Sequence, residues 1–144
     1  MKKIGFASDH AGYELKEFLV GYLDAKGYDI FDFGCHSVES CDYPDMAHPL
    51  AEAVADKQVD CGIAICGSGI GMSIAINRHR GVRGSLCWEV ELAALTRQHN
   101  DSNVLVLPAR FIDNTKATQI VDKYLSTAFE GDRHIQRVAK IELK

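Results

Sequence analysis

The sequence contains no apolar run that approaches the roughly 20 residues needed to cross a bilayer, and no signal-like leader precedes its first apolar stretch, IGFASD. It also lacks a basic excess, because 16 lysines and arginines face 20 aspartates and glutamates and leave a net charge of −4. Nucleic-acid-binding domains of this size are usually basic. We therefore expect a cytoplasmic protein whose partners include neither a membrane nor a nucleic acid.

The cysteines lack the pairing that metal sites and disulfide frameworks use. None stands in a C-x-x-C motif, and no cluster of cysteines and histidines has the spacing of a zinc site. Unpaired cysteines in odd number are typical of a reducing compartment. The sequence therefore predicts free thiols and no bound metal. The five thiols are those of Cys35, Cys41, Cys61, Cys66 and Cys87.

A regular alternation of short apolar segments and longer amphipathic segments is present along the whole chain. Several apolar segments have no polar face, as in parallel strands covered by helices on both sides. The 144 residues suit one domain, so we predict a single α/β domain over 1–144 with a doubly wound, parallel, five-stranded sheet. Strands are predicted at 2–7, 28–34, 61–66, 82–87 and 103–108. Helices are predicted at 15–27, from the loop 35–45 to Asp56, and at 88–98, 114–128 and 132–142.

Ligands of such sheets bind beyond the carboxyl ends of the strands, and polar residues follow three of the predicted strands. These are SDH at 8–10, CGS at 66–68 and WE at 88–89. A dinucleotide site would need G-x-G-x-x-G after the first strand, where this sequence has ASDHAG. The sequence therefore predicts a site at this edge without a dinucleotide cofactor.

The stretch AICGSGIGMSIA (64–75) ends an apolar segment with Cys66 and then places Gly67, Gly69 and Gly71 before a helical pattern. Glycines let backbone N–H groups turn inward at the start of a helix, where they stabilise negative charge. The same field favours the thiolate of a nearby cysteine. We predict an anion site beside a reactive thiol, the anion being either a phosphate or an oxyanion formed during a reaction.

Each candidate residue also has a purely structural interpretation. A cysteine that ends a buried strand usually serves as a small hydrophobic residue, which is the role we predict for Cys61 and Cys87. For Cys66 the glycine loop favours chemistry as well. His99 ends a predicted helix, where a histidine more often serves the helix terminus than catalysis.

The segment EGDRHIQRVAK (130–140) places Arg133, Arg137 and Lys140 on one helical face. Such a face is usually only solvated, although two arginines one turn apart also suit phosphate binding. A thiol, an oxyanion site, an acid–base histidine and phosphate-binding arginines together suit metal-free proton transfer on a small phosphorylated carbonyl compound.

Five motifs resemble, in order, those of the B-type ribose-5-phosphate isomerases, a family that includes galactose-6-phosphate and allose-6-phosphate isomerases. They are SDHAG (8–12), DYPD (42–45), CGSGIG (66–71), RQHNDSN (97–103) and EGDRHIQRV (130–138). The resemblance implies a Rossmann-like fold and a homodimer with shared active sites; whether dimers form tetramers stays open. It also implies interconversion of D-ribose 5-phosphate and D-ribulose 5-phosphate, in the pentose phosphate pathway, without metal or cofactor.

The resemblance further implies a role for each site residue. Cys66 would move a proton between C2 and C1, and His99 would open the furanose ring with Asp9 close by. Ser68 would relay a proton between the sugar oxygens. The cis-enediolate would rest on the backbone of Gly67, Ser68, Gly69, Ile70 and Gly71.

The remaining contacts implied by the resemblance concern the phosphate and the sugar. His10, Arg110, Arg133 and Arg137 would bind the phosphate. Asn100 and Tyr43 would contact the sugar. The C-terminal helix at about 132–142 would reach the dimer partner. One branch of the family has a glutamate in the glycine loop, whereas this chain has Met72 there and fits the branch that uses cysteine.

Three alternatives stay open at this point. The first is that the same reaction acts on a 6-phosphohexose rather than on a pentose phosphate, since the length of the pocket cannot be read from sequence. A second alternative is a sensor of phosphorylated metabolites that keeps the fold without catalysis. The third is a hydrolase with Cys66 as nucleophile, which would require the fold to bring His99 beside the thiol.

Overall fold

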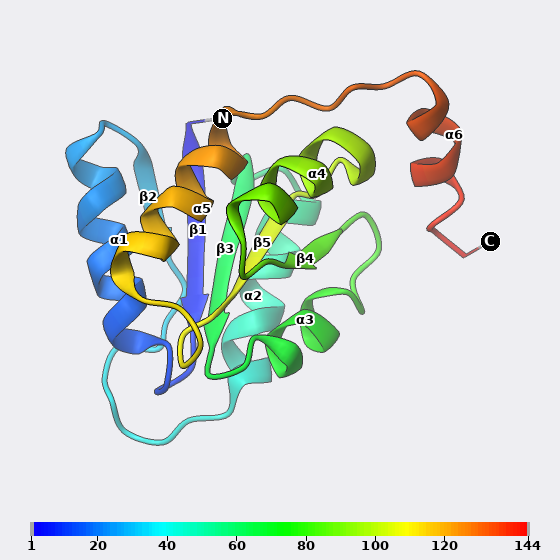
Figure 1. Cartoon of the computed structure of the whole chain (residues 1–144). Helices are drawn as coiled ribbons and strands as arrows, with labels where there is room; N and C mark the ends of the chain where they lie inside the picture. The colour runs from blue at the N-terminus through cyan, green and yellow to red at the C-terminus, as the bar shows by residue number, and fades with distance from the viewer. Residues whose placement is uncertain (1, 144) are drawn as a thin grey trace.

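A computed structural model describes residues 2–143, and its centre is a five-stranded sheet in which every pairing is parallel. The strand order is β2-β1-β3-β5-β4, so the last strand lies between β3 and β4 (Figure 1). The predicted doubly wound α/β fold is thus confirmed. The strands are β1 Lys3–Ser8, β2 Asp29–Asp32, β3 Cys61–Cys66, β4 Gly84–Leu86 and β5 Val104–Pro108.

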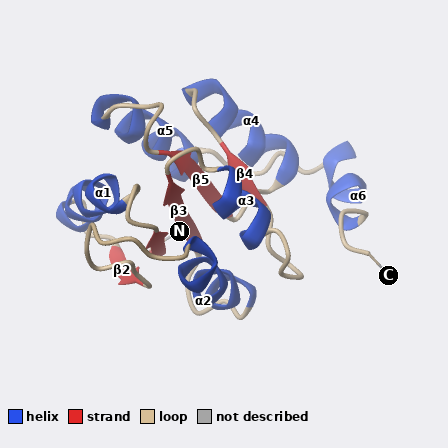
Figure 2. Ribbon diagram, turned by 90° about the horizontal axis from the view of Figure 1, so that it is seen from below, coloured by secondary structure: helices blue, strands red, loops and turns tan. Residues whose placement is uncertain are grey.

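Helices cover both faces of this sheet (Figure 2). One face carries α1, α4 and α5, and the other carries α2 and α3. Within residues 2–143, no helix combines the length and the hydropathy that crossing a bilayer would take. The helices are α1 Tyr13–Ala25, α2 Tyr43–Ala55, α3 Ile70–Ile76, α4 Val90–Asn100, α5 Asn114–Ser126 and α6 Arg133–Ala139.

An apolar layer lies on each face of the sheet, between the strands and the helices, and β5 contributes side chains to both layers. Leu105 and Leu107 pack toward α1, α4 and α5, whereas Val104 and Val106 pack toward α2 and α3. All four are fully buried. Burial of each such side chain contributes about 1.5–3 kcal/mol relative to exposure. The central strands therefore have no polar face because helices cover both faces of the sheet.

The face that α1 buries is not purely apolar. Leu15, Leu19 and Leu23 are buried, but Phe18 is 41% exposed. Lys16 is fully buried instead, and its Nζ lies 2.6 and 2.8 Å from the two carboxylate oxygens of Asp32 in β2. The ion pair offsets the cost of removing the ammonium group from water. Hydrophobic periodicity cannot predict such a pair, because the two residues are distant in sequence.

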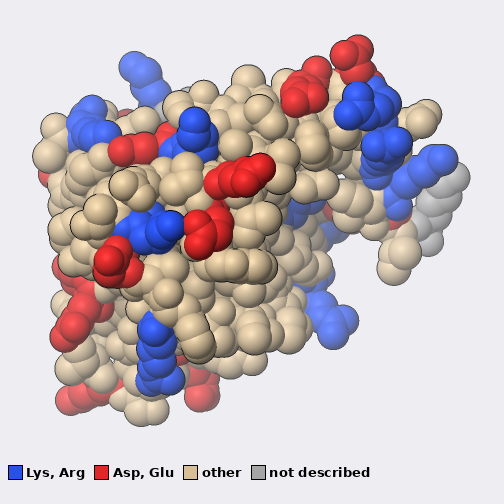
Figure 3. All heavy atoms as spheres, viewed as in Figure 1, with Lys and Arg blue, Asp and Glu red and all other residues tan. Residues whose placement is uncertain are grey.

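The C-terminal helix α6 lies apart from the sheet and packs near the end of α4. An extended segment, 127–132, carries the chain from α5 across the molecule to α6 (Figure 1). The tail beyond α6 then contacts the loop after α3, where the Gly81 N–H donates to Glu142 Oε1 at 2.6 Å. Lys and Arg side chains gather over α6 (Figure 3), which thus projects a basic arm from the domain.

Candidate active site

The carboxyl ends of β1 and β3 open into a cavity of about 520 Å³. Residues from two of the three predicted polar segments, 9–10 and 66–68, line this cavity, whereas 88–89 line a neighbouring, mostly apolar cavity of about 550 Å³. The strand-end rule therefore located the first two segments correctly. The first cavity is lined by Asp9, His10, Ala11, Tyr43, Cys66, Gly67, Ser68, Gly71, Arg110 and Phe111.

Cys66 is the last residue of β3 and contributes its side chain to this cavity, with 5% of the residue exposed. The backbone around it is fixed by β5, since the Ala109 N–H donates to Cys66 O at 2.9 Å. Cys61 and Cys87 do not line this cavity. Burial raises the pKa of the Cys61 and Cys87 thiols to about 12, as expected for cysteines that serve as small apolar residues.

The glycine loop that follows Cys66 keeps free backbone donors. The Ile70 N–H donates to Ser68 Oγ at 3.2 Å, but no hydrogen bond within residues 2–143 uses the N–H groups of Gly67, Ser68, Gly69 or Gly71. Gly69 has φ +76°, a left-handed conformation that turns the chain into α3. Unused N–H groups at a cavity wall suit an anion or a developing oxyanion.

Tyr43, the first residue of α2, packs against this loop. An added Cβ at Gly71 would lie 2.7 Å from Tyr43 Cζ, so only glycine admits the ring at that distance. Tyr43 is 37% exposed and lines the cavity. The close approach of α2 to the loop therefore places a phenol ring on the cavity wall.

Asp9 and His10 also line the cavity, and each accepts a hydrogen bond from a backbone N–H. Asp9 is 8% exposed, and its Oδ1 accepts from the Gly12 N–H at 2.9 Å. His10 Nδ1 accepts from the Cys41 N–H at 3.3 Å. In the neutral ring this hydrogen bond leaves the proton on Nε2. Both side chains are therefore oriented before any ligand binds.

A second group of predicted site residues lies elsewhere in the chain. His99, Asn100 and Arg137 line a cavity of about 340 Å³ between the end of α4 and α6. Arg133 and Arg137 are exposed on α6, and Figure 3 shows basic side chains on this arm. The predicted residues thus fall into two half-sites in one chain.

The two half-sites lie at opposite ends of the parallel strands, the Cys66 cavity at the carboxyl ends and the His99 cavity near the amino ends. The helix α4 leads from the carboxyl end of β4 to the amino end of β5, and His99 stands in its last turn, shortly before Val104 begins β5. Cys66 ends β3 at the carboxyl end. A strand of five or six residues separates these ends by about 16–20 Å. Within a single chain His99 therefore does not approach Asp9, and the fold does not bring it beside the Cys66 thiol as the hydrolase alternative would require.

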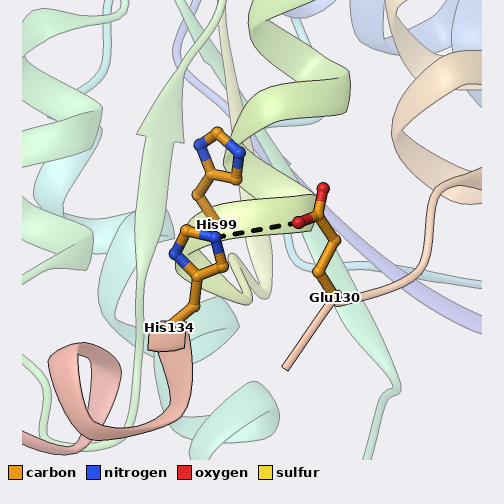
Figure 4. Close-up of side chains that lie close together, drawn as sticks. All are labelled: His99, Glu130 and His134. Atoms are coloured by element: carbon orange, nitrogen blue, oxygen red, sulfur yellow. Dashed lines mark ion pairs between the residues drawn. The ribbon is translucent and has the colours of Figure 1, made fainter. Parts of the chain in front are cut away.

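His134 lines the same cavity, and Glu130 lies beside His134; neither is among the site residues predicted from sequence. The rings of His99 and His134 stack, with centroids 4.5 Å apart. His134 Nε2 lies 3.7 Å from Glu130 Oε2 (Figure 4). Burial, followed by the charges of Arg133 and His99, lowers the pKa of His134. The i, i+4 spacing within EGDRH was the available signal, but only the fold reveals that His99 faces it.

Comparison with known proteins gives consistent sequence matches. The family model described as Ribose/Galactose Isomerase matches residues 4–141. Ribose-5-phosphate isomerase B of Escherichia coli is 47% identical over 141 residues, which cover 98% of this chain and 95% of that protein. The similarity therefore extends over nearly the whole of both sequences.

Solved structures give the same result. Ribose 5-phosphate isomerase B of Thermotoga maritima has a TM-score of 0.96 and 49% identity, and the match covers 97% of each chain. The Mycoplasma genitalium enzyme, solved with bound ribulose-5-phosphate, has a TM-score of 0.93 and 40% identity over 96% of this chain and 93% of that chain. The similarity of fold therefore matches the similarity of sequence.

Proposed function

The chain belongs to the ribose/galactose isomerase family, and on that premise we propose that it interconverts D-ribose 5-phosphate and D-ribulose 5-phosphate with Cys66 as the catalytic base. The observation that carries this proposal is the cavity in which the Cys66 side chain stands beside the unused N–H groups of the glycine loop. Aldose–ketose isomerisation needs both a positioned base and a site for the enediolate oxygens.

The reaction would proceed by transfer of one proton between adjacent carbons. The Cys66 thiolate removes the proton from C2 of the open-chain aldose, and the electron pair moves into a cis-enediolate. The N–H groups of residues 67–71 stabilise its negative charge, while the Ser68 hydroxyl exchanges a proton between the two sugar oxygens. Return of the carbon proton from Cys66 to C1 yields the ketose. Residues 66–75, which include Met72, contain no aspartate or glutamate, so this segment offers no carboxylate as an alternative base.

Ring opening and phosphate binding would use residues from both half-sites. His99 donates a proton to the ring oxygen, and Asn100 and Tyr43 contact the sugar. His10 and Arg110, at the Cys66 cavity, hold the phosphate from one side. Arg133 and Arg137 hold it from the other, and their basic arm suits a dianionic ester.

Because the two half-sites lie apart within one chain, we also propose a homodimer. In it, α6 and the end of α4 of one copy complete the Cys66 cavity of the other. Apolar side chains on both surfaces support this arrangement. Phe111, which lines the cavity, is 75% exposed, and Ile70 and Ile74 of α3 are 56% and 57% exposed. Ile135 of α6 is 58% exposed. Joining these surfaces would remove both apolar patches from water.

The decisive test measures turnover of ribose 5-phosphate in the presence of EDTA. Wild type should be active, and Cys66→Ala should lose about 10²- to 10⁴-fold in kcat, as expected for loss of a general base. Cys87→Ala, which removes a buried thiol outside the cavity, is the matched control and should retain activity. Activity of Cys66→Ala equal to that of Cys87→Ala would exclude Cys66 as the base.

The same assay with allose 6-phosphate and galactose 6-phosphate tests the hexose alternative directly, and a higher kcat/KM on either would exclude the pentose assignment. For location we propose the cytoplasm. The free state of all five thiols supports a reducing compartment.

A further inference from the structure

Three side chains at the α4–α6 contact have the donor set of a metal site. The imidazoles of His99 and His134 and the carboxylate of Glu130 each place a possible ligand atom within 4.8 Å of the other two (Figure 4). Two histidines and one glutamate form a known zinc donor set that leaves a coordination position open. The three residues come from α4, from the segment before α6 and from α6 itself.

The buried imidazole of His134 points to a missing partner. The residue is 4% exposed, and its Nε2 is the only buried side-chain nitrogen or oxygen within residues 2–143 that has no hydrogen-bond partner. The 3.7 Å to Glu130 is too long for a hydrogen bond. A buried polar atom left in this way costs about 1–3 kcal/mol, and a bound cation at Nε2 would remove that cost.

Glu130 places a negative charge beside the two imidazoles, since its Oε2 lies 3.7 Å from His134 Nε2. A carboxylate in this position favours a divalent cation.

The stack of the His99 and His134 rings must open for both to bind one ion, because nearly parallel rings, 17° apart, do not direct their nitrogen lone pairs to a common point. Bonds of 2.0–2.1 Å in a tetrahedral zinc site place the ligand atoms about 3.3 Å from one another. His134 is fixed by burial, whereas Glu130 is exposed on the extended segment and His99 is half-buried. Rotation of the latter two side chains therefore closes the site around His134.

We propose that His99, Glu130 and His134 bind a divalent transition-metal ion, with zinc the best match, and that the bound ion inhibits the isomerase by occupying His99. The inhibitory part rests on the proposed function, in which His99 donates the proton that opens the sugar ring. A coordinated imidazole nitrogen cannot carry that proton. The ion would also tie α6 to the end of α4.

Zinc binding is measured first, by calorimetric titration of ZnCl₂ into EDTA-treated, desalted protein without substrate. Wild type should bind one ion per chain at this site. Glu130→Gln, an exposed and nearly isosteric change, should weaken that binding by at least about tenfold, because loss even of an outer-shell partner commonly costs 10- to 100-fold. His134→Asn, checked for folding by circular dichroism, should weaken it as well.

The control addresses the other histidine pair of the chain. His48 Nδ1 and His79 Nε2 lie 2.7 Å apart in an exposed position, so His79→Asn reports any weaker surface binding and should leave the main site unchanged. Zinc affinity that is unchanged in both Glu130→Gln and His134→Asn would overturn the proposed site. Since no substrate is present, this result does not depend on the proposed activity.

Inhibition is measured separately with ribose 5-phosphate. Zinc should inhibit wild type at concentrations that match its calorimetric affinity, and excess EDTA should restore turnover. Glu130→Gln should need at least about tenfold more zinc than wild type for half-inhibition, with each protein measured against its own zinc-free rate. Full activity of zinc-saturated wild type would overturn the inhibitory role.

Discussion

Gly71 controls how closely Tyr43 approaches the glycine loop. A methyl group at position 71 would meet the Tyr43 ring at 2.7–3.1 Å. Gly71→Ala should therefore displace the ring, destabilise the fold by about 1–3 kcal/mol and raise KM for the sugar phosphate. Urea denaturation and steady-state kinetics measure the two effects.

Gly21 provides the matched control for this substitution. It lies within α1, and nothing would lie within 4 Å of an added Cβ. Gly21→Ala should stabilise the fold by about 0.5–1 kcal/mol through the gain in helix propensity, with unchanged KM. A Gly71→Ala enzyme that matched Gly21→Ala in both measurements would contradict the tight contact with Tyr43.

His134 should make the stability of the chain sensitive to acid. Burial lowers its pKa below the ordinary value of 6.5, so below that pH the unfolded chain takes up a proton that the folded chain resists. The stability contributed by the neutral ring is complete above pH 6.5 and declines as the pH falls. Between pH 7 and pH 5, His134→Asn should therefore lose less free energy of unfolding than wild type, as measured by urea denaturation. Equal slopes for the two proteins would count against a buried neutral His134.

At the scale of elements, α6 is a short helix whose arginines have no role in the domain that carries them. Within residues 2–143, neither Arg133 nor Arg137 forms an ion pair. Arg137→Ala should therefore leave the free energy of unfolding nearly unchanged while raising KM by about 10- to 100-fold, the range expected for one charge-assisted hydrogen bond. Gln136→Ala, an exposed change on the same helix, should alter neither quantity. Equal KM values for the two variants would remove Arg137 from phosphate binding.

Element type and order could be predicted from periodicity, since apolar segments of strand length alternate with amphipathic ones. Boundaries and faces were less certain because they depend on partners distant in sequence. The edge strand β4 is three residues long, not six. In α1 the apolar Phe18 is exposed, whereas the charged Lys16 is buried and pairs with Asp32 of β2. The position of α6 away from the sheet has no local signal at all.

For the whole molecule, complementation between two inactive variants tests the shared site. In a heterodimer of Cys66→Ala and His99→Asn subunits, one cavity combines both defects and the other has both native residues. Random exchange of a two-fold dimer should therefore restore about a quarter of wild-type activity. The measurement is turnover before and after mixed refolding, with each variant refolded alone as control. Mixtures that stay inactive although heterodimers form would show that the site does not cross the interface.

The Cys66 half of the site could be predicted from sequence because strand ends and glycine turns are local features. Asp9, His10 and Cys66 meet at one cavity for that reason. His99 and Asn100 lie instead at the end of α4, which returns the chain to the amino ends of the strands, so local sequence features do not show what they face. The grouping of His99 with Glu130 and His134 required the path of the segment 127–132 across the molecule.

His99 and Cys66 lie at opposite ends of the strands of one sheet, so in the proposed dimer the rate of catalysis depends on protein concentration. In that arrangement a dissociated subunit keeps both apolar layers of its core but has only half of each shared site. Specific activity should therefore fall on dilution in proportion to dimer dissociation, while the circular dichroism spectrum stays constant. A small molecule that separated the subunits would inhibit the enzyme without touching the sugar pocket.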